Sequence, residues 1–237
     1  MFNRIMSRSL ILFVVLALLL PTVALTAQDD SQIIDLVFIP HVAMGAAEQD
    51  VLVPVADEEG MVRRVAPDDP LSMLSQPVFA STTGAEHDPF QVGENPIGPY
   101  EQAGELGFTL GEWLAATGSG TYTVNGDSSM LETTFTNLVP NGVYTMWCST
   151  INLPPNFEII NFPCGAEDGS ENVFTADEEG NATYNIEIPA RPLSTDEALT
   201  AFAINYHSDG SAHGFDPGIF GMNAHVQIVA FANPPME

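Results

Sequence analysis

Three of the five histidines in this 237-residue chain lie in its last 31 residues, and their spacing suggests metal chemistry. His207 ends one predicted strand, and His225 begins the next. If these strands pair as a hairpin, directly opposed side chains have Cβ atoms about 4.5–5.5 Å apart, within reach of one metal ion. The loop between the strands supplies four more potential ligands: Asp209, His213, Asp216 and Met222.

The sequence therefore predicts a metal site made of His207, Asp209, His213 and His225. Histidine and carboxylate ligands suit zinc, and histidine together with methionine suits copper in an exported protein. A purely structural interpretation stays open, because strands often end in a partly exposed histidine and Asp-Gly pairs are common in turns. The metal hypothesis depends on whether the two strands are neighbours.

Other catalytic signatures are missing from the sequence. The chain contains no G-x-S-x-G, no H-E-x-x-H and no Walker loop. His87, Asp88 and Pro89 form a weaker candidate that an ordinary turn explains as well. With 31 acidic residues, a carboxylate pair for glycoside hydrolysis can be chosen anywhere and carries no information. The sequence therefore favours a protein that is not an enzyme.

The charge of the chain excludes two classes of partner. All five of its cationic residues are arginines, and with 31 acidic residues the net charge is −26. Neutralising phosphate groups needs a basic surface, so we expect no binding to nucleic acids or to anionic membranes. The acidic excess also makes calcium a third candidate cofactor, which would stabilise the fold by relieving its self-repulsion.

The first 27 residues have the pattern of a secretory signal peptide. Arg4 and Arg8 precede the apolar run 10–20, and small residues follow it as a cleavage region. Eleven apolar residues are short for a membrane span of about 20 residues, so we expect cleavage rather than anchoring. The mature protein is predicted to be secreted or held at the cell surface, without contact to the membrane itself.

Cys148 and Cys164 are the only cysteines in the chain. An exported protein meets an oxidising environment, in which such a pair forms a disulfide. The bridge would close a loop of about 17 residues, which stabilises the fold by roughly 3 kcal/mol in the chain-entropy description.

Most of the chain shows the two-residue alternation of β-strands. Apolar and polar residues alternate in residues 182–188, which predicts a strand with one buried face, and residues 172–176 are expected to pair with it as a hairpin. Residues 199–206 and 226–232 are apolar on both faces, as in central strands. These two central strands must position the predicted metal site.

One short helix is predicted near residue 110. Thr109 and Glu112 have the spacing of a capping box, in which each side chain satisfies a backbone N–H at the start of the helix. Phe108 and Trp113 are spaced to form a hydrophobic staple, and Gly118 can end the helix. We expect this helix to cover one end of the β-structure.

We predict an all-β protein: an antiparallel β-sandwich of the immunoglobulin-like or jelly-roll-like type, with that one capping helix. The sandwich is expected over residues 106–237. Strands from residues 28–66 are expected to add to its edges, because each contains a proline. Residues 67–105 hold six prolines and four glycines and are expected to be irregular.

The function favoured by the sequence is that of an exported, acidic, non-enzymatic module. Its partner would be a glycan, a protein or a cell surface, or it would build an extracellular layer. The alternative is a zinc- or copper-binding protein, or a metalloenzyme, centred on the C-terminal histidines.

Overall fold

The computed structural model describes residues 31–40, 51–65, 69, 71–84 and 97–233, so the predicted signal peptide, His41 and His87 lie outside the described residues. Every ladder between the named strands is antiparallel, which confirms the predicted all-β class. The elements are β1 (Gln32–Pro40), β2 (Leu52–Pro54), β3 (Met61–Arg64), the 3-10 helix η2 (Leu71–Ser75), β4 (Pro77–Ser81), β5 (Tyr100–Thr109), α1 (Leu110–Leu114), β6 (Thr117–Asn125), β7 (Ser128–Thr136), β8 (Val143–Asn152), β9 (Glu158–Pro163), β10 (Val173–Thr175), β11 (Ala182–Pro189), β12 (Ala198–His207) and β13 (Ala224–Phe231).

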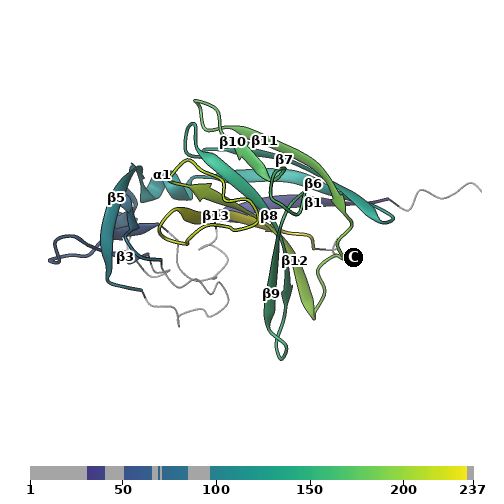
Figure 1. The fold of residues 1–237 in the computed structure, drawn as a ribbon, viewed down its shortest axis with the longest axis horizontal. Helices are drawn as coiled ribbons and strands as arrows, with labels where there is room; N and C mark the ends of the chain where they lie inside the picture. Colours follow the sequence, from purple (N-terminus) through teal and green to yellow (C-terminus); the bar gives the residue numbers. More distant parts are fainter. Residues whose placement is uncertain (1–30, 41–50, 66–68, 70, 85–96, 234–237) are drawn as a thin grey trace, which may run out of the picture.

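The main sheet is curled into two facing layers (Figure 1). Its strand order is β10-β8-β12-β13-β1-β6-β7-β11, with β9 also paired to β8. The two end strands approach each other, since the rings of Phe174 on β10 and Tyr184 on β11 lie 5.5 Å apart. Strand β1 joins the layers: residues 32–38 pair with β6, and residues 39–40 pair with β13.

Aromatic side chains fill the space between the layers. Tyr122 on β6 meets Phe202 on β12 across this space at 5.1 Å. On β1, β6 and β7, Phe38, Gly118 and Phe135 are directly opposite one another. Because glycine has no side chain, the two phenylalanine rings meet over β6, 5.1 Å apart and edge to face. Both phenylalanines are buried in the main core.

Strands β2, β3, β5 and β4 form a small closed barrel at one end of the molecule (Figure 1). Its own core consists of Leu52, Val62 and Phe79. The expectation that residues 67–105 are irregular is therefore wrong for η2, β4 and the first half of β5. Prolines are compatible with this barrel because they stand at strand ends: β2 ends with Pro54, and β4 begins with Pro77.

Helix α1 follows β5 directly and confirms the predicted capping box. The Thr109 hydroxyl accepts a hydrogen bond from the Glu112 N–H, and a Glu112 carboxylate oxygen accepts one from the Thr109 N–H at 2.7 Å. The Phe108 and Trp113 rings stack at 5.7 Å, which is the expected staple. The helix ends at Leu114, before Gly118, which is a strand residue of β6 rather than a helix terminator.

One predicted strand pairing and one predicted edge position are wrong. Strands β10 and β11 are joined by a turn at residues 176–181 but pair with β8 and β7, respectively, so this turn connects the two ends of the sheet instead of closing a hairpin. Strand β1 is an interior strand, because its proline, Pro40, stands at its last residue and leaves the ladder intact. By contrast, β12 and β13 are central neighbours, as predicted.

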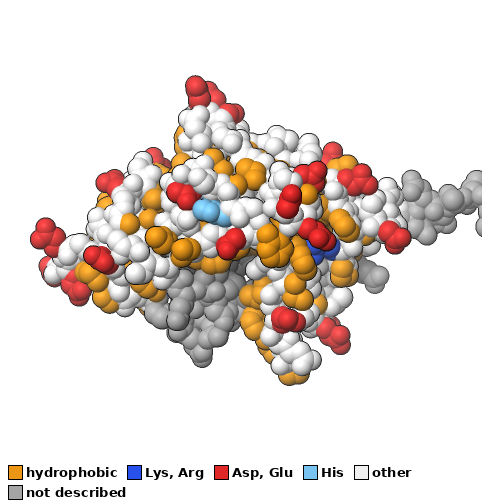
Figure 2. All heavy atoms as spheres, viewed as in Figure 1, with side chains coloured by type: hydrophobic (Ala, Val, Ile, Leu, Met, Phe, Trp, Pro, Cys, Tyr) orange, Lys and Arg blue, Asp and Glu red, His pale blue; other side chains and the backbone are white. Residues whose placement is uncertain are grey.

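The predicted disulfide is present: Cys148 and Cys164 are bonded, and their Cα atoms are 5.2 Å apart. Acidic side chains are scattered over the face shown in Figure 2, whereas basic side chains are visible there in one place only. Among the described residues, no helix is both long enough and apolar enough to cross a bilayer.

Candidate metal centre

The register between β12 and β13 separates the two histidines that were expected to face each other. Tyr206 is opposite His225, and His207 is opposite Ala224. Directly opposed residues share a face of the sheet, whereas successive residues alternate between faces. His207 and His225 therefore lie on opposite faces of the hairpin, and the expectation that their rings are opposed is wrong.

His225 is a core residue on the inner face of the sheet. It is fully buried, and its ring lies 5.9 Å from the Tyr206 ring and 6.4 Å from the Trp113 ring. Its Nε2 is 2.9 Å from the Ser208 hydroxyl oxygen, so this buried ring nitrogen has a hydrogen-bond partner. These contacts explain His225 as part of the packing under helix α1.

His207, Asp209 and His213 converge on the other side of the hairpin. Each offers one potential ligand atom, and these three atoms all lie within 4.8 Å of one another. His213 Nε2 is 3.3 Å from Asp209 Oδ2, and the rings of His207 and His213 have centroids 5.4 Å apart. Three of the four residues predicted for the site are thus brought together.

The spacing of these atoms can be compared with what zinc requires. Two ligand atoms at 2.0–2.1 Å from a tetrahedral zinc ion are about 3.3–3.4 Å apart. The Asp209–His213 pair already has this separation. Because the ligand atoms are no more than 4.8 Å apart, the His207 nitrogen would have to approach the other two by at most about 1.5 Å to reach this spacing.

His207 is held in a buried and neutral form. Only 1% of the residue is exposed, and its Nε2 is 2.8 Å from the Thr145 hydroxyl oxygen. Its Nδ1 is buried without a hydrogen-bond partner among the described residues. Burial, followed by the charge of His213, lowers the pKa of His207 to about 4, although Asp209 opposes this shift. A neutral imidazole with a spare nitrogen is the form that binds metal.

Asn223 positions the other two members of the cluster. Its Nδ2 donates a hydrogen bond to Asp209 Oδ2 at 3.1 Å and lies 3.4 Å from His213 Nε2. Its Oδ1 accepts a hydrogen bond from the Ile219 N–H at 2.7 Å. This bond fixes the orientation of the amide, so that Nδ2 faces the cluster. Gly218 has a φ of +87°, and a Cβ there would stand 3.1 Å from the His213 ring. The loop therefore fits closely around His213.

The cluster is open to solvent on one side. The side chains of Asp209 and His213 are 39% and 27% exposed, respectively, whereas His207 is buried and forms the inner side of the site. Asp216, another acid of the loop, is not part of the cluster, and its Oδ1 accepts a hydrogen bond from the Gly218 N–H. Met222 is an exposed side chain of the same loop. No sequence pattern indicated a role for Thr145, which is distant along the chain.

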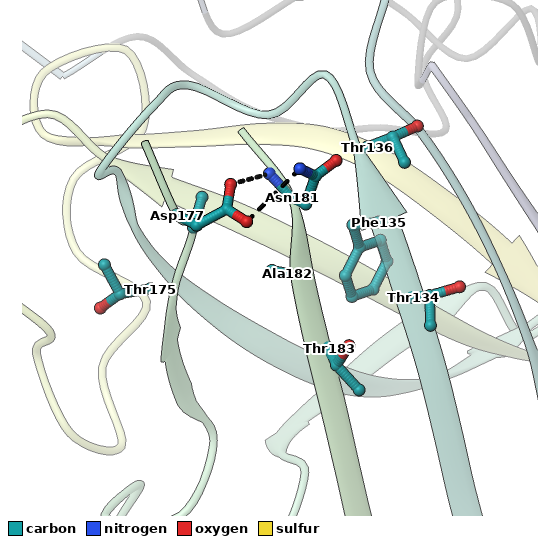
Figure 3. A pocket seen from close by; sticks show the side chains of 9 residues that line it. Thr134, Phe135, Thr136, Thr175, Asp177, Asn181, Ala182 and Thr183 are labelled. Carbon is teal, nitrogen blue, oxygen red and sulfur yellow. Dashed lines mark hydrogen bonds between the residues drawn. The ribbon is translucent and has the colours of Figure 1, made fainter. Parts of the chain in front are cut away.

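The larger pockets on the described surface are weaker candidates for a functional site than the cluster. One, of about 530 Å³, lies beside the turn between β10 and β11, and four of the nine residues that line it are threonines (Figure 3). Its acid, Asp177, is used by the turn: its carboxylate accepts hydrogen bonds from the Asn181 N–H at 2.7 Å and from the Asn181 side chain. The Asn181 N–H is the main cause of the lowered pKa of Asp177. This acid therefore stabilises the turn.

A comparison of the sequence with known families and with characterised proteins finds no match. The functional argument therefore depends on the chemistry of the cluster itself.

Proposed function

We propose that this protein is an exported, non-enzymatic binding module and that its ligand is a transition-metal ion, with zinc favoured. The ion is held by His207, Asp209 and His213. The observation that carries the proposal is the convergence of three potential ligand atoms within 4.8 Å of one another, one of them from His207, a buried imidazole whose Nδ1 has no hydrogen-bond partner among the described residues.

The donor set supports zinc over the alternatives. Two imidazoles and one carboxylate are ligands that zinc commonly takes in proteins, in tetrahedral geometry. Calcium prefers six to eight oxygen ligands, and the cluster offers one carboxylate. Copper with a methionine ligand would need Met222, which is one of the exposed apolar side chains of the loop. Copper(II) on nitrogen and oxygen ligands is the competing outcome, because such sites bind it more tightly than zinc.

Export is supported by the apolar N-terminal run and by the Cys148–Cys164 disulfide. The acidic surface supports cation binding in general, because a net charge of −26 raises the local concentration of cations. Neither feature identifies a site, so both serve as context for the cluster.

The test is the metal content and zinc affinity of the full chain, produced by secretion without a histidine tag. Elemental analysis after dialysis and chelator-competition titration are expected to give one zinc per chain. His213→Ala removes a partly exposed ligand and is expected to abolish stoichiometric binding without disturbing the fold. His207→Ala is expected to do the same, with greater risk to stability because His207 is buried.

Asp216→Asn is the matched control. Asp216 is an exposed carboxylate of the same loop, and asparagine keeps the oxygen that accepts the hydrogen bond from Gly218. This variant is expected to bind zinc like the wild type. Neither zinc nor copper at one equivalent in the wild type, or equal affinity in His213→Ala, would contradict the proposal.

A further inference from the structure

A chain of buried hydrogen bonds extends from the cluster into the sheet. The Trp147 indole N–H donates to the Thr145 hydroxyl oxygen at 2.8 Å, and the same oxygen lies 2.8 Å from His207 Nε2. Thr145 and His207 are each 1% exposed, and Trp147 is 4% exposed. Thr145 is opposite Asn205, two residues before His207, so all three side chains belong to one face of β8 and β12.

When His207 is neutral, the protons along this series of hydrogen bonds have only two arrangements. The indole N–H of Trp147 is a donor only, so it takes one lone pair of the Thr145 oxygen. In the first arrangement, His207 Nε2–H donates to the second lone pair, Nδ1 carries no proton, and the Thr145 hydroxyl hydrogen has no acceptor among the described residues. In the second, the Thr145 hydroxyl donates to Nε2, and the ring proton of His207 resides on Nδ1.

A metal ion decides between them. The second arrangement leaves the Nδ1–H of His207 without a partner among the described residues, and the first leaves the Thr145 hydroxyl hydrogen without one. Each arrangement therefore contains one unpaired buried donor, which costs about 1–3 kcal/mol in either case. Only the first arrangement also leaves a bare lone pair on Nδ1, and a cation can take that lone pair.

We propose that Thr145, held by Trp147, is a positioning residue that keeps the His207 proton on Nε2 and so presents Nδ1 as the metal-binding nitrogen. This inference rests on the proposed function, because the metal ion selects the arrangement with the proton on Nε2. Hydrogen bonds of this kind fix the tautomer and orientation of metal-binding imidazoles, and their loss typically lowers metal affinity about 10- to 100-fold.

The position of the proton is read directly by long-range proton–nitrogen NMR on the full chain labelled with ¹⁵N-histidine. His207→Gln identifies the resonances of His207. With one equivalent of zinc, His207 is expected to carry its proton on Nε2, and the metal-induced shift is expected at Nδ1. A metal-induced shift at Nε2 overturns the inference.

Two substitutions of Thr145 separate positioning from packing. Thr145→Val keeps the shape and removes the hydroxyl, and it is expected to weaken zinc binding about 10- to 100-fold. Thr145→Ser keeps the hydroxyl, and it is expected to retain wild-type affinity and the Nε2–H tautomer. Wild-type affinity in Thr145→Val overturns the positioning role. If the wild type binds no zinc, the proposed function fails and the inference fails with it. If the wild type binds zinc through Nε2 of His207, the inference alone fails.

Discussion

Gly118 provides a sharp test of how the main sheet packs. Phe38 and Phe135 approach each other over this residue from the strands on either side of β6. A Cβ at position 118 would lie 2.4 Å from Cδ1 of Phe135 and 3.2 Å from Cβ of Phe38. Gly118→Ala therefore inserts a methyl group where no space exists, and one of the two rings has to move.

The expected loss of stability follows from three contributions. Inserting a methyl group into a packed core costs about 1–3 kcal/mol. Separating the edge-to-face pair costs about 0.5–1.5 kcal/mol more if the rings lose contact. Reduced freedom of the unfolded chain returns about 0.4–1 kcal/mol when alanine replaces glycine. We expect a net destabilisation of roughly 1–3 kcal/mol, which lowers Tm by about 2–4 °C for each kcal/mol in a chain of this size.

The assay is urea denaturation of the wild type, Gly118→Ala and Gly104→Ala. Gly104 lies in β5, and a Cβ there meets no atom within 4 Å, so Gly104→Ala is expected to be neutral or slightly stabilising. Phe135→Leu combined with Gly118→Ala is expected to cost less than the sum of the two single changes, since leucine makes room for the methyl group. Equal stability of Gly118→Ala and Gly104→Ala would refute the packing of the two rings over β6.

Four further outcomes are expected. Replacing both Cys148 and Cys164 by serine lowers the free energy of unfolding by about 3 kcal/mol in guanidinium titration, and an unchanged midpoint would contradict this. Thr109→Ala costs about 1 kcal/mol of stability while Thr109→Ser costs little; equal losses would exclude the cap as the cause. Hydrogen bonds lower the pKa of Glu112 from its ordinary 4.5, and the bond from the Thr109 N–H contributes most. The stability that the ionised carboxylate contributes is therefore present above that value and disappears as the pH falls. The Tm difference between wild type and Glu112→Gln should therefore shrink from pH 7 to pH 3, and a constant difference would contradict this origin. Zinc at 100 times its Kd raises the free energy of unfolding by about 2.7 kcal/mol in the wild type but not in His213→Ala.

Several features could be predicted from residues that are close in sequence. The capping box of Thr109 and Glu112 is a local pattern and was found in place. The disulfide could be predicted because the chain has two cysteines, so each has one possible partner. The central position of β12 and β13 followed from their apolar faces, because a strand covered on both sides has no polar face.

Other features were out of reach because they depend on pairing between distant strands. The turn after β10 resembles a hairpin turn, yet β10 and β11 pair with different neighbours. Nothing near Thr145 in the sequence indicates that its hydroxyl meets His207, which is 62 residues away. Local periodicity defines a strand but does not select its partner.

For the candidate site, the amino-acid sequence alone determined which residues were available: histidines and carboxylates concentrated around one glycine-rich loop. Only the tertiary structure decided which of them meet. A register that places His225 opposite Tyr206 turns His225 into the core and leaves His207 with Asp209 and His213. The physical reason is that side chains alternate between the faces of a sheet, so an offset of one residue moves an imidazole from one side to the other.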